Sequence, residues 1–457
     1  MIKEDTISAI STAVGEAGIG IVRMSGENAI DIADKIFKSS SGKSLSEIDD
    51  RKVIFGQILD SDDSVIDEAI VFVMRSPKSY TRENVVEFQC HGNAVVLQKV
   101  LLRTFEAGAR LAERGEFTKR AFLNGRLDLS QAQAVLDIIQ AKTDKALKAA
   151  EDKLTGKISS NIYELKQQIL QMIAYIEVVI NFPEDDIEDI DLLELKNNIS
   201  LAIDSTQKIA KLETEGKILR EGIATAIIGK PNVGKSSLLN FLSKNEKAIV
   251  TEIPGTTRDT IEEYINICGI PLKIIDTAGI RNSDDKIEQI GIEKSKLCAE
   301  NATLILVLFD VSRETTVEDK EIINFVRGKN IIVLLTKSDL PVVGDVELLK
   351  KYFISEEIVS ISIKNGTGID ELQNSIMRKM SNITNELNFV KGARELEILK
   401  RIEKHLKEAQ NTLQSNLGID LISIDLCSAL DALNELIGES INDDIINEIF
   451  SKFCVGK

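Results

Sequence analysis

The sequence predicts a multidomain protein of mixed α+β and α/β class: an N-terminal α+β domain, a discontinuous helical domain, and an inserted domain with a mostly parallel sheet. Three observations support this prediction. The chain has 457 residues, about three times the length of a typical domain. Short β-branched runs alternate with helical patterns over about 220–380, whereas long helical patterns occupy the flanks, 127–218 and 393–457. Short alternating apolar runs such as GIGIVRMSG, at 18–26, mark the first domain.

The order of these patterns gives the expected limits of each part. Helical spacing of apolar residues stops at NFPEDDIEDID, 181–191, where proline and an acidic cluster mark a loop. The simplest arrangement packs the two helical blocks together, with the α/β domain between them in the chain. The expected parts are an N-terminal domain, a first helical part, the inserted domain and a second helical part, at 1–120, 121–218, 219–380 and 381–457.

The composition is that of a soluble globular protein, with 43% hydrophobic and 28% charged residues. No stretch reaches the roughly 18 apolar residues of a membrane span, and the start, MIKEDTISAI, lacks the basic and apolar segments of a signal peptide. A cytoplasmic protein without membrane contact is expected. Five scattered cysteines without CxxC spacing suggest neither disulfides nor a zinc site. A net charge of −17 excludes non-specific coating of nucleic acid, so any RNA must bind a local patch or a partner.

A phosphate-binding loop is predicted at GKPNVGKS, Gly229–Ser236, which follows an apolar strand and precedes a helix. Its glycines let successive backbone N–H groups face the phosphates. Lys235 can reach the β and γ oxygens, and Ser236 can hold Mg²⁺. A chance glycine-rich turn is the alternative for this motif alone, and the motifs that follow it in order argue against chance.

The downstream motifs indicate GTP. Asp339, in TKSD, can accept hydrogen bonds from guanine N1–H and the 2-amino group, which adenine cannot offer. DTAG at 276–279 supplies a carboxylate near Mg²⁺ and an N–H for the γ-phosphate, and TEIPGTTRDT at 251–260 supplies a loop that closes over it. The residues expected to bind GTP are Asn232, Val233, Gly234, Lys235, Ser236, Ser237, Thr251, Glu252, Ile253, Pro254, Gly255, Thr256, Thr257, Asp276, Thr277, Ala278, Gly279, Thr336, Lys337, Ser338, Asp339, Ser362, Ile363 and Lys364.

The residue after DTAG is Ile280, where signalling GTPases often carry a glutamine that positions water. Another side chain must supply this function. Composition alone does not choose among the polar residues that follow, and they could equally form a solvated loop: Arg281, Asp284, Asp285, Glu288 and Glu293.

Over essentially its full length the chain resembles the tRNA modification GTPase family MnmE. An unrelated GTPase would share only the nucleotide motifs. The further segments that carry the resemblance are GIGIVRMSG, SYTRENVVEFQCHGN, RGEFTKRAFLNGRLDLSQAQAV, NFPEDDI and the terminal FCVGK.

The resemblance implies a tetrahydrofolate-binding domain that forms a homodimer, a helical domain, and a P-loop GTPase (G) domain inserted into it. It also implies a heterotetramer with the flavin-dependent partner MnmG, in which the partner holds FAD. Together they would place an aminomethyl-type substituent on C5 of the wobble uridine of tRNA. The one-carbon unit would come from 5-formyl-tetrahydrofolate or a related tetrahydrofolate.

By motif, Arg23, Glu87, Arg126 and the terminal Lys457 match the folate-contacting positions of the family. A carboxylate suits the donor edge of a reduced pterin, and cations suit its glutamate tail. Arg126 departs from the lysine that many members carry. Without the family match, an ordinary Arg23–Glu87 ion pair would be the simpler interpretation. Cys454 has two interpretations, a role in one-carbon transfer or a small buried hydrophobe.

The resemblance also implies GTP hydrolysis activated by K⁺-dependent dimerisation of G domains. Asn232 matches the K⁺-binding side chain, and Thr251, Ile253 and Thr256 match the loop that completes the site. Glu288 matches the glutamate that orients water, so the expected catalytic residues are Glu288 and Lys235.

The Mg²⁺ ligands expected by motif are Ser236 and Thr257. Thr336 replaces the asparagine of NKxD, which normally braces the loop and guanine N7, so weaker nucleotide affinity is expected.

Two other functions compete with this one. A regulatory or ribosome-associated GTPase of the Era or Der type needs no one-carbon chemistry, but usually adds a basic RNA-binding module. A stand-alone folate-dependent transferase regulated by GTP would need its own redox site, and no GxGxxG flavin motif is evident.

Overall fold

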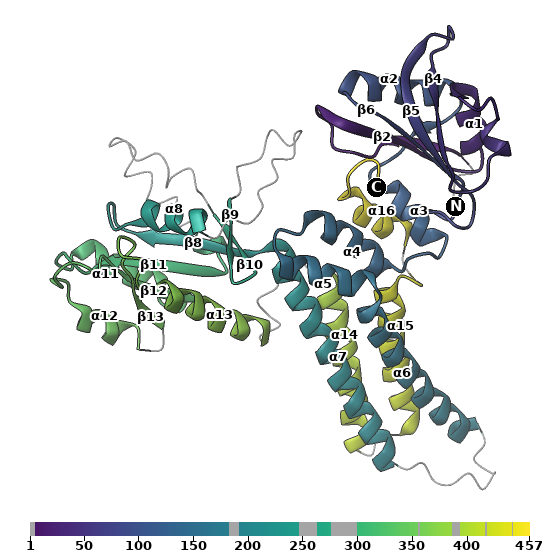
Figure 1. The fold of residues 1–457 in the computed structure, drawn as a ribbon. Helices are drawn as coiled ribbons and strands as arrows, with labels where there is room; N and C mark the ends of the chain where they lie inside the picture. The colour runs from purple at the N-terminus through teal and green to yellow at the C-terminus, as the bar shows by residue number, and fades with distance from the viewer. Residues whose placement is uncertain are drawn as a thin grey trace.

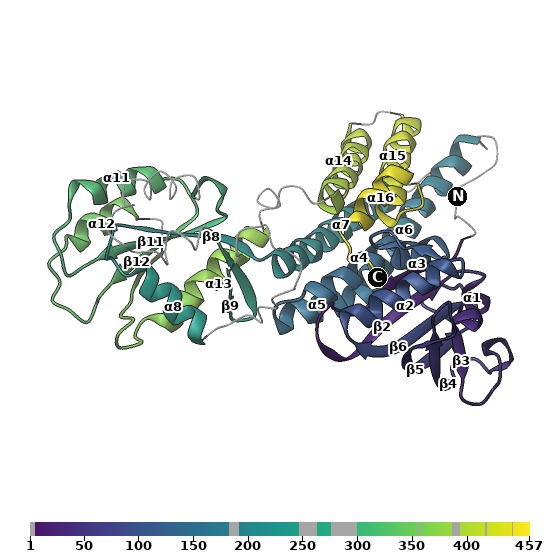
Figure 2. The same cartoon turned by 90° about the horizontal axis from the view of Figure 1, so that it is seen from above.

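The computed structural model describes residues 5–181, 192–245, 263–275, 299–354, 357–385, 394–415, 418–440 and 442–457. The inserted domain stands apart from the N-terminal sheet in both views, with α4 (Leu129–Gln140) and α5 (Asp144–Leu154) lying between them (Figures 1 and 2). The C-terminus returns to the N-terminal domain. The predicted combination of an α+β domain, a discontinuous helical domain and an inserted α/β domain is confirmed.

The N-terminal domain is a seven-stranded sheet in the order β3-β4-β5-β6-β2-β1-β7. Side chains of α1 and α2 join the apolar side chains of one sheet face in a single core. Arg23 and Glu87 are cross-strand partners in the register of β2 and β6. The elements are β1 Ile7–Ile10, β2 Ala17–Ser25, α1 Ala29–Ile36, β3 Phe37–Ser39, a 3₁₀ turn Leu45–Glu47, β4 Val53–Leu59, β5 Val65–Met74, β6 Val85–Gly92, α2 Ala94–Glu106 and β7 Arg110–Leu111.

The helical domain joins both flanks of the insertion in one core, as expected from the sequence. Leucine, isoleucine and alanine at helical spacing on α6, α7, α14 and α15 form this core. Asp128 and Gln131 make a capping box that begins α4, and Gly438, at φ +94°, ends α15. The remaining helices are α3 Glu116–Leu123, α6 Lys157–Asn181, α7 Leu192–Glu221, α14 Arg394–Gln414, α15 Ile419–Ile437 and α16 Asp443–Ser451.

The inserted domain has a six-stranded sheet in the order β13-β12-β11-β8-β10-β9, parallel except for β9. Its central strands are apolar at nearly every position because two cores, one on each face, bury them. The elements are β8 Ile223–Gly229, α8 Lys235–Asn245, β9 Glu263–Ile267, β10 Ile270–Ile274, β11 Leu304–Asp310, α11 Val317–Val326, β12 Ile331–Thr336, α12 Val346–Tyr352, β13 Glu357–Ser360 and α13 Ile369–Asn385.

The inserted domain meets the helical domain at the end of α7 and at the α4–α5 turn. Helix α7 passes into β8 through Gly222, at φ +76°, where a Cβ would lie 2.7 Å from the carbonyl oxygen of Pro271. The tip of the β9–β10 hairpin lies on the α4–α5 turn, where Thr143 Oγ1 donates to the Gly269 carbonyl at 2.8 Å. The Lys142 ammonium lies over the Tyr264 ring. The hairpin is thus held against the end of α4.

Helix α4 also contacts the end of the chain. Ala132 of α4 belongs to a small core with Ile446, Phe450 and Phe453, against which Leu136 packs. One helix therefore touches both the inserted domain, through the turn that follows it, and the C-terminal segment. Over the described ranges, no helix combines the length and the apolar character that crossing a membrane requires.

Candidate functional site

The phosphate-binding loop is built at the end of β8. Asn232, at φ 60°, and Gly234, at φ 108°, occupy the left-handed region on either side of Val233. Gly229 is required by space, because a Cβ there would lie 2.8 Å from the Leu308 carbonyl oxygen. Left-handed residues in such a loop turn successive N–H groups toward one point, and α8 begins at once with Lys235. The described part of the loop therefore fits a nucleotide phosphate.

Lys235 folds back over the loop it follows. Its Nζ donates to the Gly229 carbonyl at 2.6 Å and to the Lys230 carbonyl at 2.8 Å. Phosphate oxygens would offer the same ammonium stronger, charged acceptors. Lys235 is thus placed where the sequence motif requires it.

Asp339 is held by the SIK segment. Its Oδ1 accepts a hydrogen bond from Ser362 Oγ at 2.7 Å, and this bond lowers the pKa of the Asp339 carboxyl. The Ser338 N–H donates to the Ile361 carbonyl at 3.2 Å, which ties the same loop to the strand end. The two predicted base-recognition segments are thus adjacent, and the carboxylate is ionised and oriented.

Thr336 braces the loops despite replacing asparagine. Its hydroxyl lies 2.8 Å from the Val233 carbonyl oxygen and 3.2 Å from that of Phe309, and the residue is 1% exposed. Sequence reasoning noted that threonine replaces the asparagine that normally braces the loop, and the hydroxyl reaches the phosphate loop in its place. Weaker nucleotide affinity stays a prediction.

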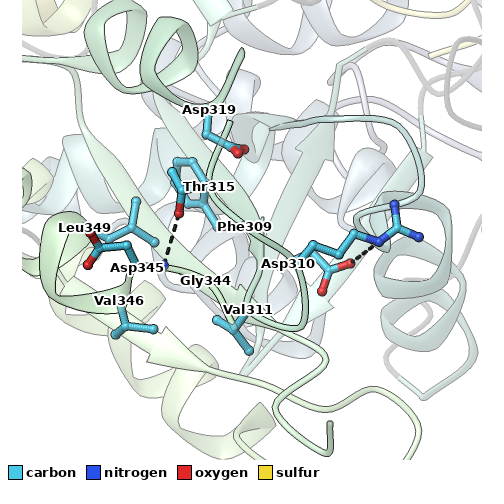
Figure 3. Close-up of a pocket in the computed structure, with 10 residues that line it drawn as sticks. Phe309, Asp310, Val311, Thr315, Asp319, Gly344, Asp345, Val346 and Leu349 are labelled. Atoms are coloured by element: carbon cyan, nitrogen blue, oxygen red, sulfur yellow. Dashed lines mark hydrogen bonds and ion pairs between the residues drawn. The ribbon is translucent and has the colours of Figure 1, made fainter. Parts of the chain in front are cut away.

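A pocket at the end of β11 is lined by residues that include Asp310 and Asp319 (Figure 3). Asp319 accepts from Lys230 of the phosphate loop, and Asp310 accepts from Lys337 of TKSD, each at 2.6 Å. Burial would raise the pKa of Asp310, but hydrogen bonds from Lys337 and Ser312 outweigh it and the pKa is lowered. These two carboxylates therefore bind the lysines of the two loops. Sequence reasoning did not identify either carboxylate.

A second cluster lies on the N-terminal sheet. Arg23 Nε donates to Glu87 Oε1 at 2.7 Å, and both side chains are 16% exposed. The Arg23 guanidinium lies 5.9 Å from the ring centre of Tyr80 and 5.7 Å from that of Phe117. The two predicted folate residues thus meet as an ion pair with aromatic groups beside the cation.

Tyr80 connects Arg126 to this cluster. The Arg126 guanidinium lies 4.7 Å from the Tyr80 ring centre, and its Nη1 donates to the Tyr80 carbonyl at 2.7 Å. The Tyr80 hydroxyl is 2.9 Å from Thr118 Oγ1, and burial raises the pKa of this phenol. Sequence reasoning missed Tyr80, although it lies within the SYTREN segment that carries part of the resemblance.

The last residues of the chain complete the cluster. Gly456 adopts φ 95°, and its carbonyl accepts from Ser11 Oγ at 3.1 Å and faces Arg23 Nη1 at 3.5 Å. Burial, followed by the charge of Arg23, lowers the pKa of Lys457. All four residues predicted for folate therefore belong to one network of contacts and charges.

Cys454 is exposed, so the interpretation as a small buried hydrophobe is wrong. Its role in one-carbon transfer stays a prediction. His91, also in the resembling segment, is exposed and bonds through Nδ1 to Asp67 at 2.7 Å.

Several predicted site residues lie outside the described residues. They include the loop expected to close over the γ-phosphate, the DTAG segment and the expected catalytic glutamate: Thr251, Glu252, Ile253, Pro254, Gly255, Thr256, Thr257, Asp276, Thr277, Ala278, Gly279 and Glu288.

Two family models match the chain. The MnmE helical domain matches residues 129–454, and the N-terminus of the GTP-binding protein TrmE matches residues 6–126. The first spans more than half of the chain, and together they cover almost all of it. Each domain of the fold therefore lies within a matched region.

Curated relatives are similar over the whole length. A tRNA modification GTPase MnmE of Thermoanaerobacter pseudethanolicus is 47% identical, covering 99% of each chain, and that of Clostridioides difficile is 46% identical, covering 100% of each. Among solved structures, Era bound to MgGDPNP and a 16S ribosomal RNA segment is 29% identical over 40% of this chain and 65% of its own, with a TM-score of 0.27. The full-length matches show that the chain belongs to the MnmE (TrmE) family of tRNA modification GTPases.

Proposed function

We propose that the protein hydrolyses GTP to drive a folate-dependent, aminomethyl-type modification at C5 of the tRNA wobble uridine, together with an MnmG-type flavoprotein. Family membership supports GTP hydrolysis in tRNA modification. The observation that carries the folate part is the network of Arg23, Glu87, Arg126 and Lys457, in which Tyr80 joins the two arginines.

In the nucleotide site, Lys235 would exchange its two carbonyl acceptors for the β and γ oxygens of GTP. Ser236, the next residue of α8, would hold Mg²⁺, which neutralises charge that develops on the phosphates. Asp339, oriented by Ser362, would accept from guanine. Glu288 would orient the attacking water in place of the missing glutamine.

Activation by K⁺ is part of the proposal. Asn232, at a left-handed position of the phosphate loop, would supply a ligand for K⁺, and Thr251, Ile253 and Thr256 would complete the site. A bound cation there supplies the charge that an arginine finger supplies in other GTPases. Pairing of two G domains in the homodimer would assemble this arrangement.

In the folate site, Arg23 engages Oε1 of Glu87, so the donor edge of a pterin would meet the other carboxylate oxygen. Arg126 and Lys457 would face the glutamate tail as cations. Tyr80, between the two arginines, would keep them in place. Cys454 would lie near the one-carbon unit.

The assembly follows from the same proposal. The N-terminal domain would pair two copies, and the flavoprotein, holding FAD, would complete a heterotetramer in the cytoplasm. The domain limits 1–120, 121–218, 219–380 and 381–457 are proposed with it. An Era- or Der-type role without one-carbon chemistry is the alternative, and it leaves the folate network unexplained.

Two measurements test the proposal. The steady-state GTPase rate is measured in KCl and in NaCl at equal ionic strength, for wild type and Glu288→Ala. Strong K⁺ stimulation that is lost in the variant is expected. Equal rates in the two salts would remove the cation mechanism and favour the Era or Der alternative.

Folate binding is measured separately, by calorimetry with 5-formyl-tetrahydrofolate. Glu87→Gln is expected to weaken binding by tenfold or more, because a charged partner is lost. Glu106→Gln, at a 58% exposed side chain of the same domain, is the matched control. Undiminished binding by Glu87→Gln would contradict the proposed pterin contact.

A further inference from the structure

We propose that this enzyme recognises guanine at its N1–H and 2-amino edge, and that residue 336 makes no hydrogen bond to guanine N7. The inference rests on GTP as the substrate of the proposed function. Besides its role as a brace, Thr336 would thus determine that the enzyme does not recognise guanine N7.

A threonine hydroxyl has a single hydrogen to donate. Thr336 Oγ1 lies within hydrogen-bond distance of two carbonyl oxygens, at 2.8 Å from Val233 and 3.2 Å from Phe309. Carbonyl oxygens only accept, so the hydroxyl must donate to one of them. Guanine N7 is also only an acceptor. The hydroxyl therefore has no hydrogen left for N7.

Asparagine differs at this position because its amide carries two N–H groups. One can hold a loop carbonyl while the other reaches the base. Thr336 is also buried, with 1% exposure, and its hydroxyl is directed to the phosphate loop and the end of β11. Threonine in place of asparagine therefore keeps the hydrogen bond that joins the loops and loses the hydrogen bond to guanine N7.

The neighbouring residues direct selectivity to Asp339. Lys337 places its ammonium 2.6 Å from Asp310, on the side of the pocket at the end of β11. Asp339 is oriented by Ser362 at 2.7 Å. Discrimination between purines should therefore depend on the N1–H and 2-amino edge that Asp339 contacts. Replacement of N7 by carbon should leave recognition unchanged.

The test compares GTP with 7-deaza-GTP, in which C–H replaces N7, as substrates of the full-length protein. For wild type, kcat/KM for the two nucleotides should agree within about twofold. Thr336→Asn should create a preference for GTP of about three- to tenfold, the range of one net hydrogen bond. Inosine triphosphate, which lacks the 2-amino group, should be a poor substrate for both proteins.

Two further variants guard against a misfolded Thr336→Asn protein. Thr336→Ser keeps the hydroxyl, so its ratio of kcat/KM for GTP to kcat/KM for 7-deaza-GTP should stay near one. Thr336→Val removes the donor from the Val233 and Phe309 carbonyls, so affinity for both nucleotides should fall together while their ratio stays near one.

The wild-type ratio alone decides the inference. A preference of wild type for GTP over 7-deaza-GTP of fivefold or more would overturn it, because a protein donor would then reach N7. If wild type turned over neither nucleotide, GTP hydrolysis itself would be refuted, and with it the premise. GTP turnover with strong discrimination against 7-deaza-GTP would refute only the inference.

Discussion

Replacing Gly456 by alanine should disconnect the end of the chain from the N-terminal domain. The residue has φ 95°, and an added Cβ would lie 2.3 Å from the Ile10 carbonyl oxygen. An ordinary carbon–oxygen contact is about 3.3–3.6 Å, so the tail must retreat by about 1 Å. The left-handed backbone adds about 1–2 kcal/mol for a residue with a Cβ.

The predicted effect on folate binding follows from what the tail positions. Retreat of Gly456 breaks its bond with Ser11 and withdraws Lys457 from Glu87 and Arg23. Loss of one charge-assisted contact costs about 1.5–3 kcal/mol, which corresponds to about 10- to 150-fold in affinity. Binding of 5-formyl-tetrahydrofolate, measured by calorimetry, should weaken by that factor, while the GTPase rate stays unchanged.

Gly42→Ala is the matched control, because it has the same backbone problem without the collision. Gly42 has φ 72°, and within the described part of the chain a Cβ there meets no atom within 4 Å. Its folate affinity should equal that of wild type. Circular dichroism checks that both variants are folded. If Gly456→Ala then bound folate as tightly as Gly42→Ala, the C-terminal tail would have no part in the site.

Three further outcomes are expected. Thr143→Val removes the hydrogen bond to Gly269 and the N-cap of α5, which together contribute about 1–3 kcal/mol to stability. Hydrogen exchange at the tip of the β9–β10 hairpin should therefore accelerate. Unchanged protection there would show that the contact between the hairpin and the α4–α5 turn is weak. Burial raises the pKa of Cys90 to about 12, so at pH 8 it should react with a thiol reagent far more slowly than the exposed cysteines, as followed by mass spectrometry. The hydrogen bond and charge of Asp67 raise the pKa of His91, so the folded state favours the charged imidazole. The stability that the His91–Asp67 pair contributes is therefore present below about pH 6.5. It is lost as the pH rises through the raised pKa of His91. NMR titration should show this shift, and Asp67→Asn should abolish it.

The inserted domain was the most predictable part of the fold. Its strands are buried on both faces, so runs such as ILVLF are apolar without interruption and stand out in the sequence. The antiparallel β9 follows a segment without such a run and was not anticipated. Nucleotide motifs are local, so spacing along the chain was enough to place Lys235 and Asp339.

The cluster proposed to bind folate depends on contacts that spacing along the chain does not encode. Family motifs gave the four charged residues, but Lys457 comes close to Arg23 and Glu87 only because Gly456 contacts Ser11, near the opposite end of the chain. Tyr80 went unnoticed because a single aromatic residue has no periodic pattern of its own. The brace made by Thr336 was also hidden, because a motif records which residue departs and not which carbonyl the new side chain reaches.

Helix α4 could transmit motion between the inserted domain and the cluster at the end of the chain. Its 12 residues form a rod of about 18 Å, with the hairpin of the inserted domain at one end and the core beneath the chain terminus toward the other. A tilt of about 5° at one end displaces the opposite end by about 1.6 Å. Misplacement of a reacting group by about 1 Å can change a rate about 100-fold. A small rotation of α4 at the hairpin would therefore displace the core beneath the chain terminus far enough to change the position of Lys457.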